Sequence, residues 1–238
     1  MERKGVLDMV FDIYKKNLEM LVPIVLYAIF LYLAVLFAVI LFLPMSFIWL
    51  PWLETKLFWD PTFLLKLAIL IILVLIPIAA VGGAIAFGTL SRMALSAVTT
   101  GKSNLERDFK AAMGRLAPLI IVLLLTAVLS IIASVVPILG PALVITALSP
   151  APILVILGSS ASNAISDAFR IMSDAFNRKA EIPLVIFIIA LLSSTGTIGL
   201  LVLILGVPYA YLLLAYYIVY ELKWAPPPPR APRSPRRY

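Results

Sequence analysis

Residues 116–157 read LAPLIIVLLLTAVLSIIASVVPILGPALVITALSPAPILVIL and contain no Asp, Glu, Lys or Arg. About 20 apolar residues in an α-helix cross the roughly 30 Å hydrocarbon core of a bilayer, so this run is long enough for two crossings. The proline- and glycine-containing stretch 137–141 marks a turn near its middle. The run therefore predicts two membrane-spanning helices, near 116–136 and 141–157, and Pro150 is expected to interrupt the second.

Three other apolar runs extend this pattern, and Gly206 with Pro208 divides the last of them into two helices. The additional helices are expected near 20–43, 63–90, 182–205 and 207–222. The second is overlong and contains Pro77, so it is expected to kink and to continue below the membrane to Thr99. Hydrophobic residues make up 63% of the chain and charged residues 13%, far from the roughly one-half and one-quarter of soluble domains. The sequence predicts an all-α fold, a polytopic transmembrane helical bundle of about six spans over residues 1–222. A Pro/Arg-rich cytoplasmic tail at 223–238 follows it.

Positive charges are distributed unequally over the two sides of this arrangement. The net charge is +7, and every Lys and Arg except Lys56 and Lys66 falls in the terminal segments or in the loops after the second and fourth helices. Cytoplasmic loops carry such an excess, so both termini are expected to be cytoplasmic in a multi-pass protein of the cell (plasma) membrane. The basic residues lack the clustered stripe that follows a phosphate backbone, so nucleic acid is not expected as a partner.

A threefold repeat leads into the first, third and fifth helices, with a phenylalanine at the same place in each copy. Apolar residues recur at positions i, i+4, i+7 and i+11, which share one face of a helix. The three sets are Leu7, Phe11, Tyr14 and Leu18; Leu105, Phe109, Ala112 and Leu116; and Ile165, Phe169, Met172 and Phe176. We expect three repeats of an amphipathic cytoplasmic helix followed by a membrane hairpin. Ser103 and Glu106 are expected to form a capping box at the start of the second copy.

These amphipathic helices are predicted to lie at the membrane surface, with phenylalanine toward the acyl chains and basic residues near anionic headgroups. The expected membrane-surface residues are Phe11, Lys15, Lys16, Phe109, Lys110, Arg115, Phe169, Arg178 and Lys179. Amphipathicity alone does not separate this interpretation from helices that only pack under the bundle, so both stay open.

The end of the chain is a proline- and arginine-rich segment, for which polyproline II is the expected local form. Its residues of interest are Pro226, Pro227, Pro228, Pro229, Arg230, Arg233, Arg236 and Arg237. One interpretation is a stiff docking tail for a protein partner, and the other is a disordered basic tail that only enforces topology.

Chemistry-bearing side chains are scarce. The chain has no Cys and no His, so thiolate and imidazole chemistry is excluded, and no cofactor, metal or catalytic residue is expected. Apart from Lys66, the interiors of the expected spans carry no ionisable residue other than tyrosine, which argues against a proton relay or an ion-coupled pump. Gln is also absent and Asn is rare, a depletion that thermophile proteins often show.

Small and hydroxyl-bearing residues supply the remaining features of the spans. Ala80, Ala84 and Gly88 form a small-residue ridge at spacing four, suited to close helix packing. Hydroxyl groups occur at Thr126, Ser130, Ser134, Ser193, Ser194, Thr195 and Thr197. Helices in lipid use such groups to bond one another, and the alternative is a polar path for a substrate.

The order of these elements resembles that of a known group of membrane proteins. With helices marked by Phe11, Phe109 and Phe169, a small-residue stretch at 79–88 and paired spans after each, the chain resembles prokaryotic and archaeal polytopic proteins related to the membrane domain of glycerophosphoryl diester phosphodiesterases. The resemblance implies a six-helix architecture. The phosphodiesterase catalytic domain is absent here, so the enzyme activity is not expected to carry over.

Two functions are compatible with these features. The first is a non-enzymatic membrane scaffold or accessory subunit that binds partners through its amphipathic helices and its tail. The second is a carrier or transport-like protein for lipids or other amphiphiles, in contact with membrane lipids. A lateral cavity between the spans would favour the second function over the first.

Overall fold

The structure, a computed structural model, describes residues 5–37, 63–193 and 196–223. The last part of the first apolar run and nearly all of the Pro/Arg tail fall outside these ranges. The docking residues expected in the tail, Pro226, Pro227, Pro228, Pro229, Arg230, Arg233, Arg236 and Arg237, therefore lie outside the described part of the chain.

Every regular element within the described ranges is helical, so the prediction of an all-α bundle is confirmed. The helices are α1 (Val6–Lys16), α3 (Phe63–Thr100), α4 (Leu105–Met113), α5 (Leu116–Ala133), α6 (Leu139–Leu148), α7 (Ala151–Ile156), α8 (Ala161–Arg178), α9 (Glu181–Leu192) and α10 (Gly196–Tyr216). A 3-10 turn at Leu18–Met20 follows α1 and leads directly into a helix that reaches Phe37; the two together are called the Leu18–Phe37 helix. A π-helical turn at Tyr217–Glu221 follows α10.

Five helical stretches among the described residues are long and apolar enough to cross a membrane. They are Leu18–Phe37, Leu75–Thr100, Leu116–Ala133, Leu139–Ile156 and Gly199–Glu221. By the length and composition of its helices, the chain is a membrane protein.

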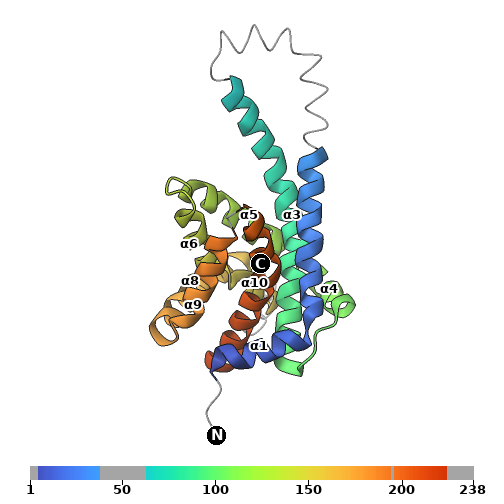
Figure 1. The fold of residues 1–238 in the computed structure, drawn as a ribbon, viewed down its shortest axis with the longest axis vertical. Helices are drawn as coiled ribbons and strands as arrows, with labels where there is room; N and C mark the ends of the chain where they lie inside the picture. Colours follow the sequence, from blue (N-terminus) through green and yellow to red (C-terminus); the bar gives the residue numbers. More distant parts are fainter. Residues whose placement is uncertain (1–4, 38–62, 194–195, 224–238) are drawn as a thin grey trace, which may run out of the picture.

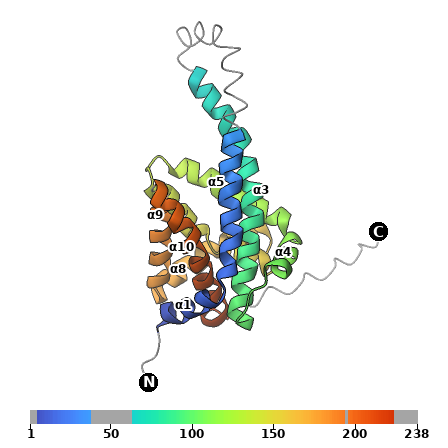
Figure 2. The same cartoon turned by 45° about the vertical axis from the view of Figure 1, so that its right-hand side comes forward.

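The helices are arranged around α3, the longest of them. In Figures 1 and 2, α3 runs beside the Leu18–Phe37 helix, and both reach beyond the other helices at one end. At the opposite end α1 lies across the bundle, roughly perpendicular to α3. The core lies where α3, α5, α7 and α10 meet, with Leu90, Met93, Leu119, Leu154 and Leu212 fully buried.

Small residues let α3 approach its neighbours closely. Ala80 and Ala84 are buried, and so is Gly88, where an added Cβ would lie 2.5 Å from Leu119 Cδ1 on α5. At Gly82 an added Cβ would lie 2.5 Å from Phe30 Cε1 on the Leu18–Phe37 helix. Such close approach compensates for the weak hydrophobic drive between helices in lipid.

A tight turn joins α5 to α6 in the stretch of sequence that contains Pro137 and Gly140. Ile138 has φ 67° and ψ −53°, and the Leu139 amide donates to the Pro137 carbonyl at 2.7 Å, which is the rare, strained form of γ-turn. An added Cβ at Gly140 would lie 1.8 Å from the Ala133 carbonyl oxygen, so only glycine fits there. The next helix is interrupted at Pro150, between α6 and α7.

The predicted turn at Gly206 and Pro208 is wrong, because α10 runs without a break through both residues. Pro208 removes one backbone donor, which a membrane helix tolerates. Gly206 serves packing instead of a turn, since an added Cβ would lie 3.1 Å from the Ile189 side chain of α9. Helix α9 ends at Leu192 and α10 begins at Gly196, so the helix expected at 182–205 does not exist as one span.

The helix α9 is correspondingly short. Its 12 residues reach about 18 Å, too little to cross the hydrocarbon core. The expected continuation of the second helix beyond Leu90 is confirmed, since α3 passes through Pro77 and continues ten residues further to Thr100.

Candidate functional site

A lateral cavity of about 330 Å³ lies between α3, α5, α6, α7, α9 and α10 and is partly open. Its walls are mostly aliphatic, and Ile145, Ile189, Leu203 and Val207 are among the lining residues. This volume is at the lower end of the range for small-molecule sites, which are typically apolar with a few polar groups.

Hydroxyl groups are the polar features of this cavity. Thr126, Ser149 and Ser193 donate to the carbonyls of Val122, Thr146 and Ile189 at 2.8, 2.8 and 2.6 Å. Because their protons are used within the helices, they present only oxygen lone pairs to the cavity.

Tyr211 is the exception, since its hydroxyl bonds to no other described residue. Its ring stacks against Phe87 with centroids 6.0 Å apart, and both residues line the cavity. Tyr211 is therefore available to donate to a bound molecule.

The hydroxyls predicted from sequence do not all reach this cavity. Thr126 and Ser193 line it, whereas Ser130 has a buried hydroxyl without a partner in the described part of the chain. The side chains of Ser194, Thr195 and Thr197 lie outside the described residues.

The three amphipathic helices, α1, α4 and α8, each bury one edge of the predicted apolar face against the bundle and leave the other edge exposed. The buried residues stand at i+3 and i+7 of the repeat: Val10 and Tyr14, Asp108 and Ala112, Ala168 and Met172. At i+4, Phe11, Phe109 and Phe169 are 47%, 41% and 50% exposed. Each helix therefore packs on the bundle and also presents a phenylalanine outward.

Contacts with α10 fix the position of α1. The Tyr14 hydroxyl donates to the Leu205 carbonyl at 2.9 Å, and the Tyr209 hydroxyl donates to the Leu7 carbonyl at 3.2 Å. Burial raises the pKa of Tyr14, so the phenol stays protonated and keeps donating. Phe11 contacts Tyr209 edge-on, with ring centroids 6.3 Å apart.

A second apolar groove, of about 290 Å³, lies between the Leu18–Phe37 helix, α3 and α4. Tyr27 and Phe30 line one wall, Gly82 lies at the α3 side, and Phe109 lies at the α4 side. Phe109 thus faces a groove, whereas it was predicted from sequence only as a membrane-surface residue.

The basic residues predicted at the membrane surface differ in their contacts. Lys110 pairs with Glu106 at 2.6 Å and Arg178 with Asp174 at 2.8 Å, while Lys15 Nζ lies 4.3 Å from the Phe11 ring centroid. Lys16 and Arg115 are exposed, and Lys179 is half-buried at the end of α8.

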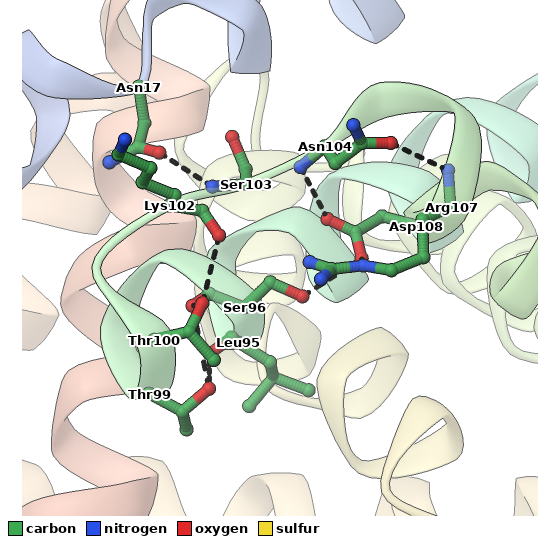
Figure 3. A network of polar contacts seen from close by, with 10 residues as sticks. All are labelled: Asn17, Leu95, Ser96, Thr99, Thr100, Lys102, Ser103, Asn104, Arg107 and Asp108. Carbon is green, nitrogen blue, oxygen red and sulfur yellow. Dashed lines mark hydrogen bonds and ion pairs between the residues drawn. The ribbon is translucent and has the colours of Figure 1, made fainter.

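A buried polar network ties the end of α3 to α4 (Figure 3). Asp108 is fully buried and accepts from the Ser96 hydroxyl at 2.9 Å, the Asn104 amide at 3.1 Å and Arg107 Nε at 3.2 Å. Each carboxylate oxygen thus has a partner, as burial of a charge requires.

The end of α1 joins the same network through Asn17. Its Oδ1 accepts from the Ser103 amide at 2.7 Å, and its Nδ2 donates to the carbonyls of Ile13 at 2.9 Å and Gly101 at 3.3 Å. This one side chain therefore fixes α1 to the loop between α3 and α4.

The predicted capping box at Ser103 and Glu106 is wrong. The N-cap of α4 is Asn104, which accepts from the Arg107 amide at 2.9 Å. Ser103 contributes its backbone amide to Asn17, and its buried hydroxyl has no partner among the described residues. Sequence reasoning also missed Asp108, because it stood among the charged residues counted as surface.

Comparisons of the chain with protein-family models, with curated proteins and with solved structures find no match. The resemblance to the membrane domain of glycerophosphoryl diester phosphodiesterases therefore stays a prediction, and functional inference rests on the cavities and contacts of the chain itself.

Proposed function

We propose that this protein holds a lipid or another amphiphile in the lateral cavity between α5, α6, α9 and α10, as a non-enzymatic carrier or transport-like membrane protein. The observation that carries the proposal is the cavity of about 330 Å³, with aliphatic walls and four hydroxyl-bearing residues. An apolar site with a few polar groups suits a ligand with a hydrocarbon part and a polar part.

The polarity of the lining supports an uncharged contact. Tyr211 supplies a donor, and Thr126, Ser149 and Ser193 supply acceptors. Among the lining residues only this tyrosine is ionisable, so an acyl chain with an ester or hydroxyl group is a better match than an ion.

The scaffold function has less support. Its docking element is the Pro/Arg tail, which lies outside the described residues. The half-exposed Phe11, Phe109 and Phe169 are compatible with a protein partner, but apolar side chains on basic amphipathic helices favour the membrane interface as their cover.

We also propose that the termini face the cytoplasm and that the protein resides in the plasma membrane. The ends of α1, α3 and α10 meet at one end of the bundle, where Asn17 Nδ2 donates to the Gly101 carbonyl at 3.3 Å and the Tyr220 hydroxyl donates to the Val98 carbonyl at 3.1 Å. Lys15, Lys16 and other basic residues gather near this end, as cytoplasmic sides require.

Filling the cavity tests the proposed function. Ala210 lines it and is 5% exposed, so Ala210→Phe should displace a bound amphiphile while leaving the bundle folded. Leu200→Phe is the matched control, because Leu200 lies on the same helix, is 49% exposed and does not line the cavity. Native mass spectrometry of the gently solubilised full chain would count the lipids retained.

The expected result is a lipid retained by the wild type and by Leu200→Phe and lost from Ala210→Phe. Equal retention by all three proteins, at equal thermal midpoints, would contradict the proposal. Tyr211→Phe should weaken retention without abolishing it, since this change removes only the donor.

A further inference from the structure

A separate pocket of about 260 Å³ lies where α3, α4, α7 and the turn after α10 come together. It is lined by two arginines, Arg92 and Arg107, with Ser96, Thr99 and Thr100 of α3 and three aliphatic residues. We call it the arginine pocket. It shares no lining residue with the lateral cavity, so an inference drawn from it does not rest on the proposed function.

Arg92 is the unusual member of the arginine pocket. Its Nε is buried and has no hydrogen-bond partner in the described part of the chain, where the side chain also forms no ion pair. A buried cationic nitrogen without a partner is strongly unfavourable, and native proteins satisfy such groups with a counter-charge, ordered water or a ligand. The buried Nε of Arg92 is therefore a donor that an anion can satisfy.

The carboxylate that contacts the pocket residues Ser96 and Arg107 does not meet this need. Asp108 is held by Ser96, by the Asn104 amide and by Arg107 Nε, on α3, the loop and α4. The contact at Nε orients the Arg107 guanidinium beside the pocket, while the side chain stays 58% exposed and keeps its terminal nitrogens as further donors. Two guanidinium groups thus line a space that one satisfied carboxylate cannot neutralise.

The hydroxyl groups help to define the ligand. Thr99 donates to the Leu95 carbonyl at 2.7 Å, Thr100 to the Ser96 carbonyl at 2.8 Å, and Ser96 to Asp108 (Figure 3). Their protons are already used, so the donors left in the arginine pocket are those of the arginines. Two planar forks of N–H groups match a group with several oxygen acceptors and negative charge.

We propose that the arginine pocket binds a phosphate-type oxyanion between Arg92 and Arg107. The anion comes either from the headgroup of an anionic phospholipid or from a soluble phosphate compound. Both sources present the same phosphate oxygens. The other lining residues, Leu95, Leu157 and Val219, are aliphatic and add no charge that would distinguish the two sources.

Charge-neutralising substitutions in the full chain test this proposal. Arg92→Gln and Arg107→Gln should each weaken binding of a phosphate-type anion about tenfold or more, because each removes a fork of charged donors. Arg92→Lys should keep part of the affinity, since it retains the charge and loses the planar fork. Lys102→Gln is the matched control, because it removes the same charge from an exposed side chain, in the loop before α4, that does not line the pocket.

Two probes separate the sources of the anion. Native mass spectrometry measures retention of added phosphatidylglycerol, and thermal midpoints are recorded in rising concentrations of inorganic phosphate. Retention by the wild type and Lys102→Gln, with loss from Arg92→Gln and Arg107→Gln, indicates a lipid headgroup. Stabilisation by phosphate with the same dependence on the variants indicates a soluble ligand.

If Arg92→Gln and Arg107→Gln behave like Lys102→Gln with both probes, the proposal is overturned. The thermal midpoint of each variant without ligand shows whether a loss of binding comes from misfolding. Arg92→Gln removes a guanidinium whose buried Nε has no partner among the described residues, so it should not lower that midpoint. A lower midpoint would mean that Arg92 has a structural role, and the outcome at the more exposed Arg107 would then decide.

Discussion

Removal of the Asp108 carboxylate is expected to destabilise the bundle more than removal of any exposed charge on α4. In the variant Asp108→Ala the Ser96 hydroxyl, the Asn104 amide and Arg107 Nε all lose their acceptor. Ser96 is 6% exposed, so its hydroxyl cannot turn to bulk water, whereas Arg107 is 58% exposed and recovers its hydration.

The expected loss in free energy of unfolding depends on which of these donors can reach water. An unsatisfied buried polar group costs about 1–3 kcal/mol, and loss of a hydrogen bond to a charged group adds a similar amount. We expect a loss of about 3 kcal/mol for Asp108→Ala, equal to roughly 6–12 °C in thermal midpoint for a chain of this size. Asp108→Asn keeps one acceptor oxygen and should cost about 1–2 kcal/mol.

The assay is thermal unfolding of the purified full chain in a single detergent. Glu106→Ala is the control, since Glu106 lies on the same helix in an exposed pair with Lys110 and should change stability by less than about 0.5 kcal/mol. The double variant Ser96→Ala/Asp108→Ala should be no less stable than Asp108→Ala, because it removes the orphaned hydroxyl. The reasoning is refuted if Asp108→Ala and Glu106→Ala have the same midpoint.

Three other substitutions test the packing. Gly140→Ala should abolish monodisperse protein in size-exclusion chromatography, because the new Cβ would lie 1.8 Å from the Ala133 carbonyl oxygen; a well-folded variant would contradict the turn geometry. Gly88→Ala should cost only about 1 kcal/mol in thermal unfolding, since the atom it meets is the movable end of Leu119, and a loss as large as that at position 140 would be inconsistent with this. Tyr14→Phe should lower stability by about 1 kcal/mol below pH 10, and wild type and variant should converge as rising pH ionises Tyr14; a pH-independent difference would argue against the hydrogen bond.

Composition and apolar runs are sufficient to predict a helical membrane bundle, but they do not locate every turn. The turn after Ala133 falls where proline and glycine crowd together, and its geometry excludes a Cβ at Gly140. The same residue types at Gly206 and Pro208 lie inside α10. They are ambiguous in sequence, because glycine also permits close packing and a membrane helix tolerates a lost backbone donor.

The repeat illustrates a second limit of sequence reasoning. Periodicity predicts which residues share a face, but it does not say which edge of that face meets the bundle. In α1, α4 and α8 the contact runs along i+3 and i+7, so a charged residue, Asp108, is buried while Phe109 beside it is half-exposed. The neighbouring helix determines which edge of α4 is buried, because Ser96 of α3 donates a hydrogen bond to Asp108.

The polar residues near the end of α3 could be recognised as a candidate binding site from the sequence, but only if the end of the helix was placed correctly. If the helix stopped near Leu90, Arg92 would be a loop charge with no further consequence. Because α3 continues to Thr100, Arg92 lies eight residues, or about 12 Å, inside its end. Arg92, Ser96 and Thr99 then occupy positions i, i+4 and i+7, a polar stripe on one helical face. A polar stripe on an otherwise apolar helix needs polar partners, and α4 supplies Asp108 and Arg107 for it while leaving Arg92 Nε without one. The extent of the helix beyond its apolar run therefore determines whether a binding pocket can be recognised.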